Sequence, residues 1–315
     1  MKNEEKKKSK GFTIVELLTV MGVIAILIGL LVPALNLVRD FANEIQQKAQ
    51  FHSMKAAIEM FSTEYGFYPP SSDNYATGHP VDNTPYGGAQ KLAEALAGWD
   101  LIGFHPRSDF RSDGTFTHDD GTGTGGLITN APAYHMDSDY AGGGNLAFAE
   151  NADQNKKART PFMELENANA YTMENVYGAA NVGSYLTSSF VICDEYAKKR
   201  STGKKTGMPV LYWRANTNIT TQDSTADADG DGFATNDDIY NFDDNEGLLQ
   251  LVTAEQDSAI QRMLTGVQFD AFINNNDVPT TFNSPYRAKS YILISAGKDG
   301  YYGTADDITN FDKKD

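Results

Sequence analysis

An uncharged run of 22 residues, from Leu17 to Val38, constrains this chain more than any other feature. As a helix, the run is long enough to cross the ~30 Å hydrocarbon core of a bilayer. Five lysines and two glutamates lie among the ten residues at the N-terminus, and a basic flank of this kind stays in the cytoplasm. The sequence therefore predicts a single-pass membrane protein, with most of its 315 residues on the far side.

Two simpler interpretations of this run leave residues unexplained. A secretory signal peptide has a shorter apolar region followed by a small-residue cleavage site, whereas here Pro33 and an amphipathic pattern continue the segment. A plain membrane anchor does not account for Glu16, because a carboxylate near the start of an apolar helix is costly in lipid and normally has a partner. Glu16 is therefore expected to have a partner.

The residues around Glu16 resemble a known cleavage signal. The segment Gly11–Leu17 reads GFTIVEL, which is similar to the GFTLxE signature of type IV prepilins and type II secretion pseudopilins. The resemblance implies that a prepilin peptidase cuts between Gly11 and Phe12 and then N-methylates Phe12. Glu16 becomes the fifth residue of the mature chain, as in that family. It would face the new α-amine of a neighbouring subunit in a filament, and such a pair fixes register because breaking it strands a charge.

Helical periodicity continues beyond the apolar run. An apolar stripe at a spacing of three to four residues is formed by Phe51, Met54, Ile58, Phe61 and Tyr65. Gly66 and the pair Pro69-Pro70 are stop signals, and Tyr65–Pro70 resembles the YGxYP segment that follows this helix in the major pseudopilin. The sequence predicts a cleaved leader at 1–11 and a helix over 12–66 that spans the membrane in about 12–38.

The head is expected to comprise residues 67–315. A helix is predicted over about 88–97, and strands over 209–216 and 289–295. The resemblance implies that the two strands pair in a small antiparallel sheet lying on the N-terminal helix, giving the α+β type IV pilin fold with insertions at about 105–160 and 217–288. Region 105–160 is poor in aliphatic residues and is expected to be a surface excursion whose aspartates lie in solvated turns. Cys193, the sole cysteine, excludes an intramolecular disulfide and is expected in the core.

Residues 227–238 match a calcium-binding DxDxDG loop of the EF-hand or dockerin type. Calcium takes six to eight oxygen ligands, and such a loop supplies carboxylates from its odd positions around a glycine turn. The predicted ligands are Asp227, Asp229, Asp231, the carbonyl of Phe233, and Asp238 at the twelfth position. The alternative is an acidic, flexible turn.

A second predicted calcium loop lies near the C-terminus. The segment Ser295–Ile308 resembles the SxGxDGxxGTxDDI segment of the major pseudopilin of type II secretion. The resemblance implies that Asp299, Asp306 and Asp307, with nearby carbonyl groups, hold one structural calcium ion. Calcium is the cofactor that we expect.

The resemblance implies a structural subunit of a type II secretion pseudopilus, with no enzymatic activity. Its partners would be the membrane, a prepilin peptidase, other copies of itself, other pilins or pseudopilins, and the secretion assembly platform. It would reside in the bacterial inner membrane with its head in the periplasm, and then in a filament. The alternatives are a minor type IV pilin or adhesin-like tip subunit, and a membrane-tethered calcium-dependent enzyme or carbohydrate-binding protein. The net charge of −16 argues against nucleic acid as a partner.

Overall fold

The computed structural model describes residues 13–72, 84–106, 108–112, 114–119, 127–132, 134, 159–164, 168–222, 238–251, 253, 256, 263, 265–275, 278 and 284–311, with backbone alone in 115–119 and 127–132. The chain divides into two compact units, Met1–Ile45 and Gln46–Asp315. Helix α1, Ile14–Tyr65, begins in the first unit and ends in the second.

The described part of the first unit is a single, largely apolar helix. Large hydrophobic side chains from Ile14 to Ile45 are exposed on all sides, and Pro33 lies inside the helix without ending it. Among the described residues, α1 is the one helix long and apolar enough to cross a membrane. A helix that is apolar all round needs either a protein core or lipid around it.

The second unit is built around a three-stranded antiparallel sheet with the strand order β7-β8-β9. Strand β7, Leu211–Arg214, pairs with β8, Tyr291–Ser295, which also pairs with β9, Ile308–Thr309. Successive side chains alternate between the two faces of the sheet, and both faces are buried. The predicted pairing of the two strands is confirmed.

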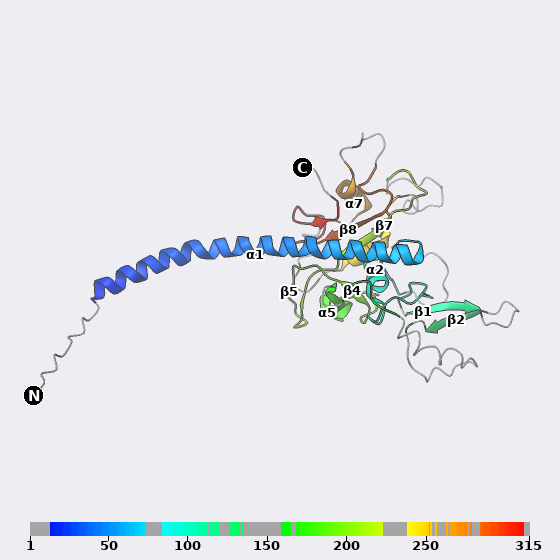
Figure 1. Cartoon of the computed structure of the whole chain (residues 1–315), viewed down its shortest axis with the longest axis horizontal. Coiled ribbons are helices and arrows are strands. Elements are labelled where there is room, and N and C mark those ends of the chain that lie inside the picture. Colours follow the sequence, from blue (N-terminus) through cyan, green and yellow to red (C-terminus); the bar gives the residue numbers. More distant parts are fainter. Residues whose placement is uncertain are drawn as a thin grey trace, which may run out of the picture. The chain divides into compact units, whose positions relative to one another are not determined.

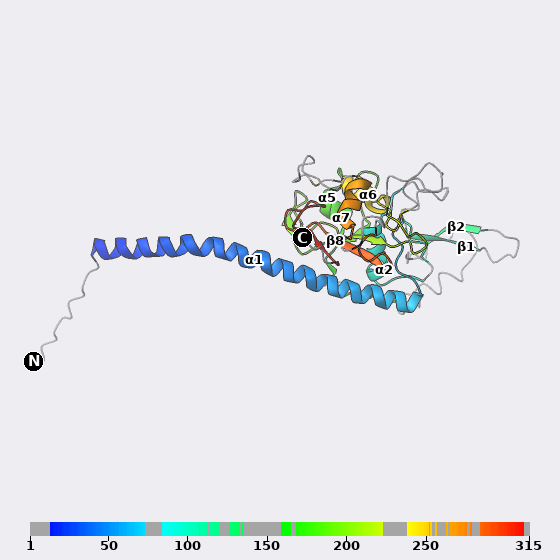
Figure 2. The same ribbon diagram turned by 90° about the horizontal axis from the view of Figure 1, so that it is seen from above.

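One face of this sheet packs on α1. The helix contributes Phe51, Met54, Ala57 and Ile58, and the strands with their flanks contribute Val210, Tyr212, Tyr291 and Leu293, all buried together. Figures 1 and 2 show the last part of α1 running along one side of the head, with α2, Gly88–Ala97, beside the sheet. The predicted α+β class, with a sheet lying on the N-terminal helix, is confirmed, and the arrangement is consistent with a pilin-like fold.

The other face of the sheet is covered by elements from the region expected as the second insertion. Helices α6, Asp243–Gln250, and α7, Gly266–Ile273, bury Leu248 and Phe269 completely. The Phe269 ring lies 4.7 Å from that of Trp213, in β7, between ring centroids. Residues between the two paired strands therefore form part of the main core.

The remaining strands form two-stranded pairs around this centre. Strand β3, Ala170–Thr172, pairs with β4, Phe190–Ile192, and is followed by α5, Met173–Tyr177. Strand β5, Lys198–Lys199, pairs with β6, Lys205–Thr206. Cys193 is buried at the end of β4, as predicted.

Region 105–160 contains a hairpin of β1, Thr115–Asp119, and β2, Leu127–Pro132. The expectation that this region lies wholly on the surface is wrong at five described residues, which are all buried: His105, Phe110, Ser112, Gly114 and Tyr134. The reason is that a few aromatic rings bury much area even in a polar segment. The ring of Phe110 stacks on that of Phe104 at 5.1 Å and lies 6.5 Å from that of Phe61, in α1.

Candidate functional site

The described N-terminal end of α1 is closed by a capping box. The Thr13 hydroxyl and backbone N–H donate to Glu16 Oε2 over 2.8 and 2.9 Å, and the Glu16 N–H donates to Thr13 Oγ1 over 3.2 Å. This reciprocal pattern satisfies backbone donors that have no partner within the helix. In the single chain, therefore, Thr13 holds the carboxylate of Glu16. The spacing of Thr13 and Glu16 is the signal by which sequence reasoning could have found it.

The predicted C-terminal calcium loop folds back on itself between β8 and β9. It contains three glycines at positive φ, which are Gly297 at 62°, Gly300 at 83° and Gly303 at 85°. A Cβ atom at Gly297 would lie 2.3 Å from the carbonyl oxygen of Asp306. Only glycine permits this backbone conformation together with so close an approach.

The loop brings the three predicted aspartates into one network of hydrogen bonds. The Asp299 N–H donates to Asp306 Oδ2 over 2.8 Å, and the Gly303 N–H donates to Asp307 Oδ2 over 2.7 Å. The Thr304 hydroxyl lies 2.7 Å from Asp306 Oδ1 and 3.2 Å from Asp307 Oδ1. Thr304 thus joins two of the predicted ligands, a role that the sequence analysis missed.

The carboxylates of the loop lie close enough together to change each other's pKa values. Partial burial raises the pKa of Asp299, and the neighbouring charge of Asp306 adds to this effect. Although partial burial acts in the opposite direction, the hydrogen bonds from Thr304 and from the Asp299 N–H hold the pKa of Asp306 below its usual value.

The donor set of the loop, carboxylate and carbonyl oxygens, fits calcium chemically. A cation would also relieve the repulsion between Asp299 and Asp306. In the part of the chain that the structure describes, however, no three Asp, Glu, His or Cys side chains are arranged as a metal site.

The loop at 227–238 is placed only at its last residue. Its predicted ligands Asp227, Asp229, Asp231 and Phe233 lie outside the described residues. Asp238 is buried and lines a cavity of about 270 Å³. Ser71, Arg214, Asn216 and Asp244 also line this cavity.

The comparison with protein families decides the nature of the N-terminal segment. Residues 6–32 match the prokaryotic N-terminal methylation motif. This motif is a type IV pilin-type signal, and it contains the predicted cleavage residues Gly11 and Phe12 as well as Glu16. It implies a pilin-like or pseudopilin substrate of a prepilin peptidase. Together with the apolar helix, the motif indicates a membrane-anchored protein. No curated protein and no solved structure gives a significant match.

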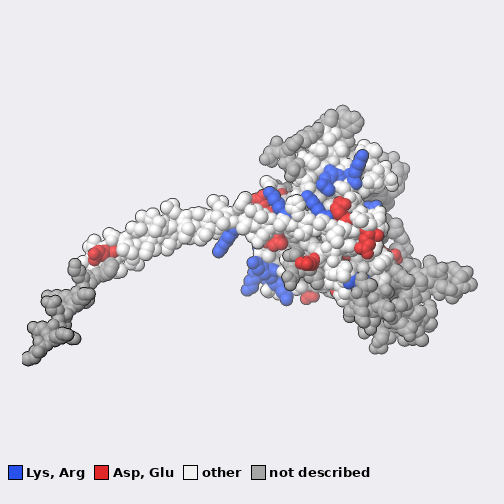
Figure 3. Space-filling view, viewed as in Figure 1, with Lys and Arg blue, Asp and Glu red and all other residues white. Residues whose placement is uncertain are grey.

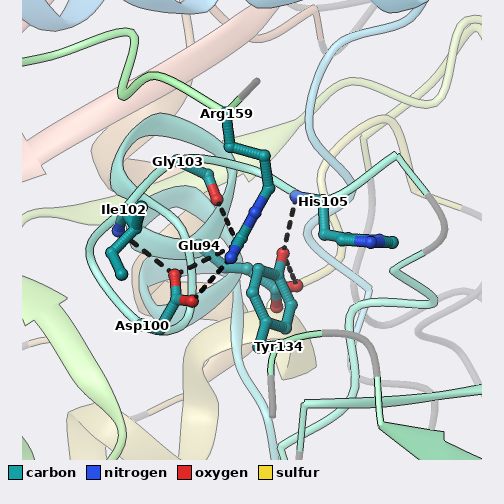
Figure 4. A network of polar contacts seen from close by, with 7 residues as sticks. All are labelled: Glu94, Asp100, Ile102, Gly103, His105, Tyr134 and Arg159. Carbon is teal, nitrogen blue, oxygen red and sulfur yellow. Dashed lines mark hydrogen bonds and ion pairs between the residues drawn. The ribbon is translucent and has the colours of Figure 1, made fainter. Parts of the chain in front are cut away.

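The methylation motif does not extend to the head, which carries a buried polar network of its own (Figure 4). Glu94, in α2, is wholly buried and accepts hydrogen bonds from Tyr86 and Tyr134 over 2.8 Å and from the Ser108 hydroxyl. Burial raises the pKa of Glu94 to about 7, although these hydrogen bonds act in the opposite direction. Tyr134 also accepts from the N–H of His105 over 3.2 Å.

A second polar contact lies beside this network. Arg159 forms an ion pair with Asp100 over 2.8 Å and donates to the carbonyl of Gly103 over 3.0 Å. Arg159, at one end of region 105–160, is thereby tied to the segment that follows α2. The network accounts for how this polar region is attached to the head.

Proposed function

We propose that this chain is a structural subunit of a type II secretion pseudopilus. It is cleaved between Gly11 and Phe12 and assembles through α1. In this proposal the head lies in the periplasm, and the subunit contacts copies of itself, other pseudopilins and the secretion assembly platform.

The observation that carries this proposal is the geometry of the C-terminal loop. The methylation motif is shared by pilins and pseudopilins, so it does not distinguish between them. The loop resembles that of the major pseudopilin in sequence, and its three glycines adopt positive φ while Asp299, Asp306 and Asp307 enter one network. Its position between β8 and β9 lets it hold the edge strand of the sheet.

We further propose that calcium binds this loop through Asp299, Asp306 and Asp307. A bound ion would supply positive charge where Asp299 and Asp306 repel each other. The ion would stabilise the pairing of β8 with β9, because the loop connects these two strands. A second calcium ion is proposed for the loop at 227–238, with Asp238 as its last ligand. Neither site is given a catalytic role.

The assembly step is proposed to exchange one partner of Glu16 for another. In the single chain the carboxylate accepts from the Thr13 N–H and hydroxyl. In a filament it would pair with the methylated α-amine of Phe12 in a neighbouring subunit. The register of subunits along the filament would then follow from this pair.

A minor type IV pilin at a filament tip is the second candidate. What favours it is the size of the head, in which region 105–160 contacts α2 through Tyr134 and Glu94 and contacts Asp100, after α2, through Arg159. Such a region suits display at a tip better than packing inside a filament.

The test uses the native host, with the gene deleted and then complemented by wild type or by Glu16→Val. Mass spectrometry of membrane protein should give an N-terminus at methylated Phe12. Deletion should abolish secretion of exoproteins while surface pili and adhesion persist, and Glu16→Val should insert into the membrane without restoring secretion. Loss of adhesion with normal secretion would instead support the tip pilin. An uncut leader in a host with the peptidase, or full assembly of Glu16→Val, would refute the assembly scheme.

A further inference from the structure

The head carries a basic hairpin, which we define as residues 198–206. It comprises β5, β6 and the turn between them, and its exposed lysines are Lys198, Lys199, Lys204 and Lys205. Figure 3 shows blue side chains gathered at the edge of the head where β5 lies in Figure 1. In a chain of net charge −16, this concentration of positive charge is a local feature that needs an explanation.

The positive charge is placed where it opposes folding. The register sets Lys199 directly opposite Lys205, and like charges in that relation destabilise a strand pair. A two-stranded hairpin is itself only marginally stable. In the part of the chain that the structure describes, no carboxylate forms an ion pair with Lys199, Lys204 or Lys205. An anion from outside the chain would relieve this repulsion.

Contacts with the rest of the head hold the hairpin in place while Lys199, Lys204 and Lys205 stay exposed. Arg200 is buried, and its Nε donates to Thr206 Oγ1 over 3.3 Å. The Thr202 hydroxyl donates to the Asn175 carbonyl over 2.9 Å, and Lys198 Nζ donates to the Asp299 carbonyl over 3.1 Å. These contacts fasten the hairpin to α5 and to the C-terminal loop, so the surface is preformed.

The residues of α1 that hold the basic hairpin follow the apolar run closely in the sequence. The segment before β5 is tied to α1, since Gln50 Nε2 donates to the Cys193 carbonyl and the Glu195 N–H donates to Gln47 Oε1, each over 2.8 Å. Both glutamines are buried. Gln47 follows Val38, the end of the uncharged run, by nine positions. The hairpin is thus anchored to the part of the head that comes soonest after the apolar run.

We propose that the basic hairpin docks on anionic phospholipid headgroups of the membrane that the apolar run of α1 enters. A tethered head meets this surface at high effective concentration, before any contact with a second subunit. Each lysine near an anionic membrane surface contributes about 1 kcal/mol, or about fivefold in the ratio of docked to undocked heads. Docking would orient the head of a subunit that is not yet in a filament. The proposal rests on membrane anchoring and applies to a pilin as well as to a pseudopilin.

The test uses the full chain in nanodiscs of phosphatidylcholine with or without phosphatidylglycerol. A fluorophore at position 201, introduced by Ser201→Cys in the turn of the hairpin, reports energy transfer to a labelled headgroup, while buried Cys193 stays unlabelled. Phosphatidylglycerol should increase the transfer, and added salt should reverse the increase. Lys199→Gln should lower the ratio of docked to undocked heads by about fivefold, and Lys199→Gln with Lys205→Gln by more.

Lys289→Gln is the matched control, because it removes one exposed lysine outside the hairpin. It should leave the transfer unchanged, and circular dichroism should show each variant folded. Transfer that does not depend on phosphatidylglycerol, or that falls equally in Lys289→Gln, would overturn the proposal. So would a hairpin contact that depends on protein concentration but not on lipid charge, since the partner would then be the acidic surface of a second copy.

Discussion

Replacing Glu94 by glutamine tests whether the network around this residue holds a protonated carboxyl group. Glu94 is wholly buried, and burial raises its pKa from 4.5 to about 7. Between these two values the folded chain keeps the proton and the unfolded chain loses it. Raising the pH therefore favours unfolding in this window, and the effect levels off below 4.5 and above about 7, where both states have the same protonation.

The magnitude follows from the size of this pKa difference. A tenfold change in proton affinity corresponds to ~1.4 kcal/mol, so the free energy of unfolding should fall by about 3 kcal/mol from Glu94 alone as the pH rises through the window. Asp194 contributes a further fall, because burial raises its pKa from 3.8 to about 7. Comparing the wild type with a variant at Glu94 separates the two contributions.

Glu94→Gln imitates the protonated side chain. Its stability should stay close to that of the wild type near pH 5 and exceed it near pH 8, by up to ~3 kcal/mol. The assay is denaturant unfolding of the full chain in detergent micelles, followed by tryptophan fluorescence. Trp99 reports on the network directly, since its ring lies 6.3 Å from that of Tyr134 and its Nε1 donates to the Ser112 carbonyl over 3.0 Å.

Two controls make this result specific. Glu94→Ala leaves three hydroxyl groups without their acceptor, so it should be destabilised at every pH. Asp194→Asn should remove the other part of the pH dependence and leave that of Glu94 in place. If Glu94→Gln and the wild type lose stability in parallel between about pH 5 and pH 8, the carboxyl group is ionised throughout and the reasoning fails.

Three further predictions concern the loop and the core. Calcium should raise the melting temperature and a chelator should lower it, by the equivalent of ~2.7 kcal/mol at a hundredfold excess of calcium over Kd. The double variant Asp306→Ala with Asp307→Ala should abolish most of this response, and Asp227→Ala with Asp229→Ala should abolish a smaller part. A melting temperature that does not change with calcium would refute both sites. Gly297→Ala should cost about 1–3 kcal/mol because of its positive φ and the nearby Asp306 carbonyl, and an unchanged melting temperature would contradict the loop geometry. Met54→Ala should cost about 2–5 kcal/mol, since Met54 is fully buried between α1 and the sheet; a loss below 1 kcal/mol in denaturant unfolding would argue against this packing.

The sequence predicts those parts of the fold whose residues follow a strong local pattern. The stripe from Phe51 to Phe61 repeats every three to four residues, so its burial under the head could be expected. Strand β7 carries two aromatic residues and β8 two isoleucines, both typical of strands, and a resemblance supplied their pairing. The ends of α1 and α2 at Gly66 and Gly98 follow from glycine at positive φ.

The parts that could not be predicted depend on contacts between distant residues. Lys91 and Glu94 lie on α2, where a charged residue normally faces solvent, yet both are buried. Their partners Ser72, Ser108 and Tyr134 come from other segments. The core contribution of α6 was hidden because polar residues surround its two leucines, Leu248 and Leu249. The sequence analysis also missed α7, although most of its residues are apolar.

The candidate sites divide in the same way. Thr13 and Thr304 stand inside recognisable motifs, so a closer look at spacing would have found them. The hydrogen bond from Lys198 to Asp299, by contrast, joins residues 101 positions apart. Only the folded chain brings the basic hairpin to the C-terminal loop.

The attachment of region 105–160 bears on how the head can change over evolutionary time. The chain enters this region beside Gly103, whose N–H donates to the Ala97 carbonyl, and returns where the Phe162 N–H donates to the Leu96 carbonyl. Entry and exit thus meet at adjacent residues of one helix. Lengthening the chain between them, or replacing residues other than the network members Ser108 and Tyr134 and the buried Phe110, leaves both bonds in place, and closing a longer loop adds little entropic cost. Selection can therefore diversify the rest of this region while these contacts and the helix and sheet beneath them stay constant.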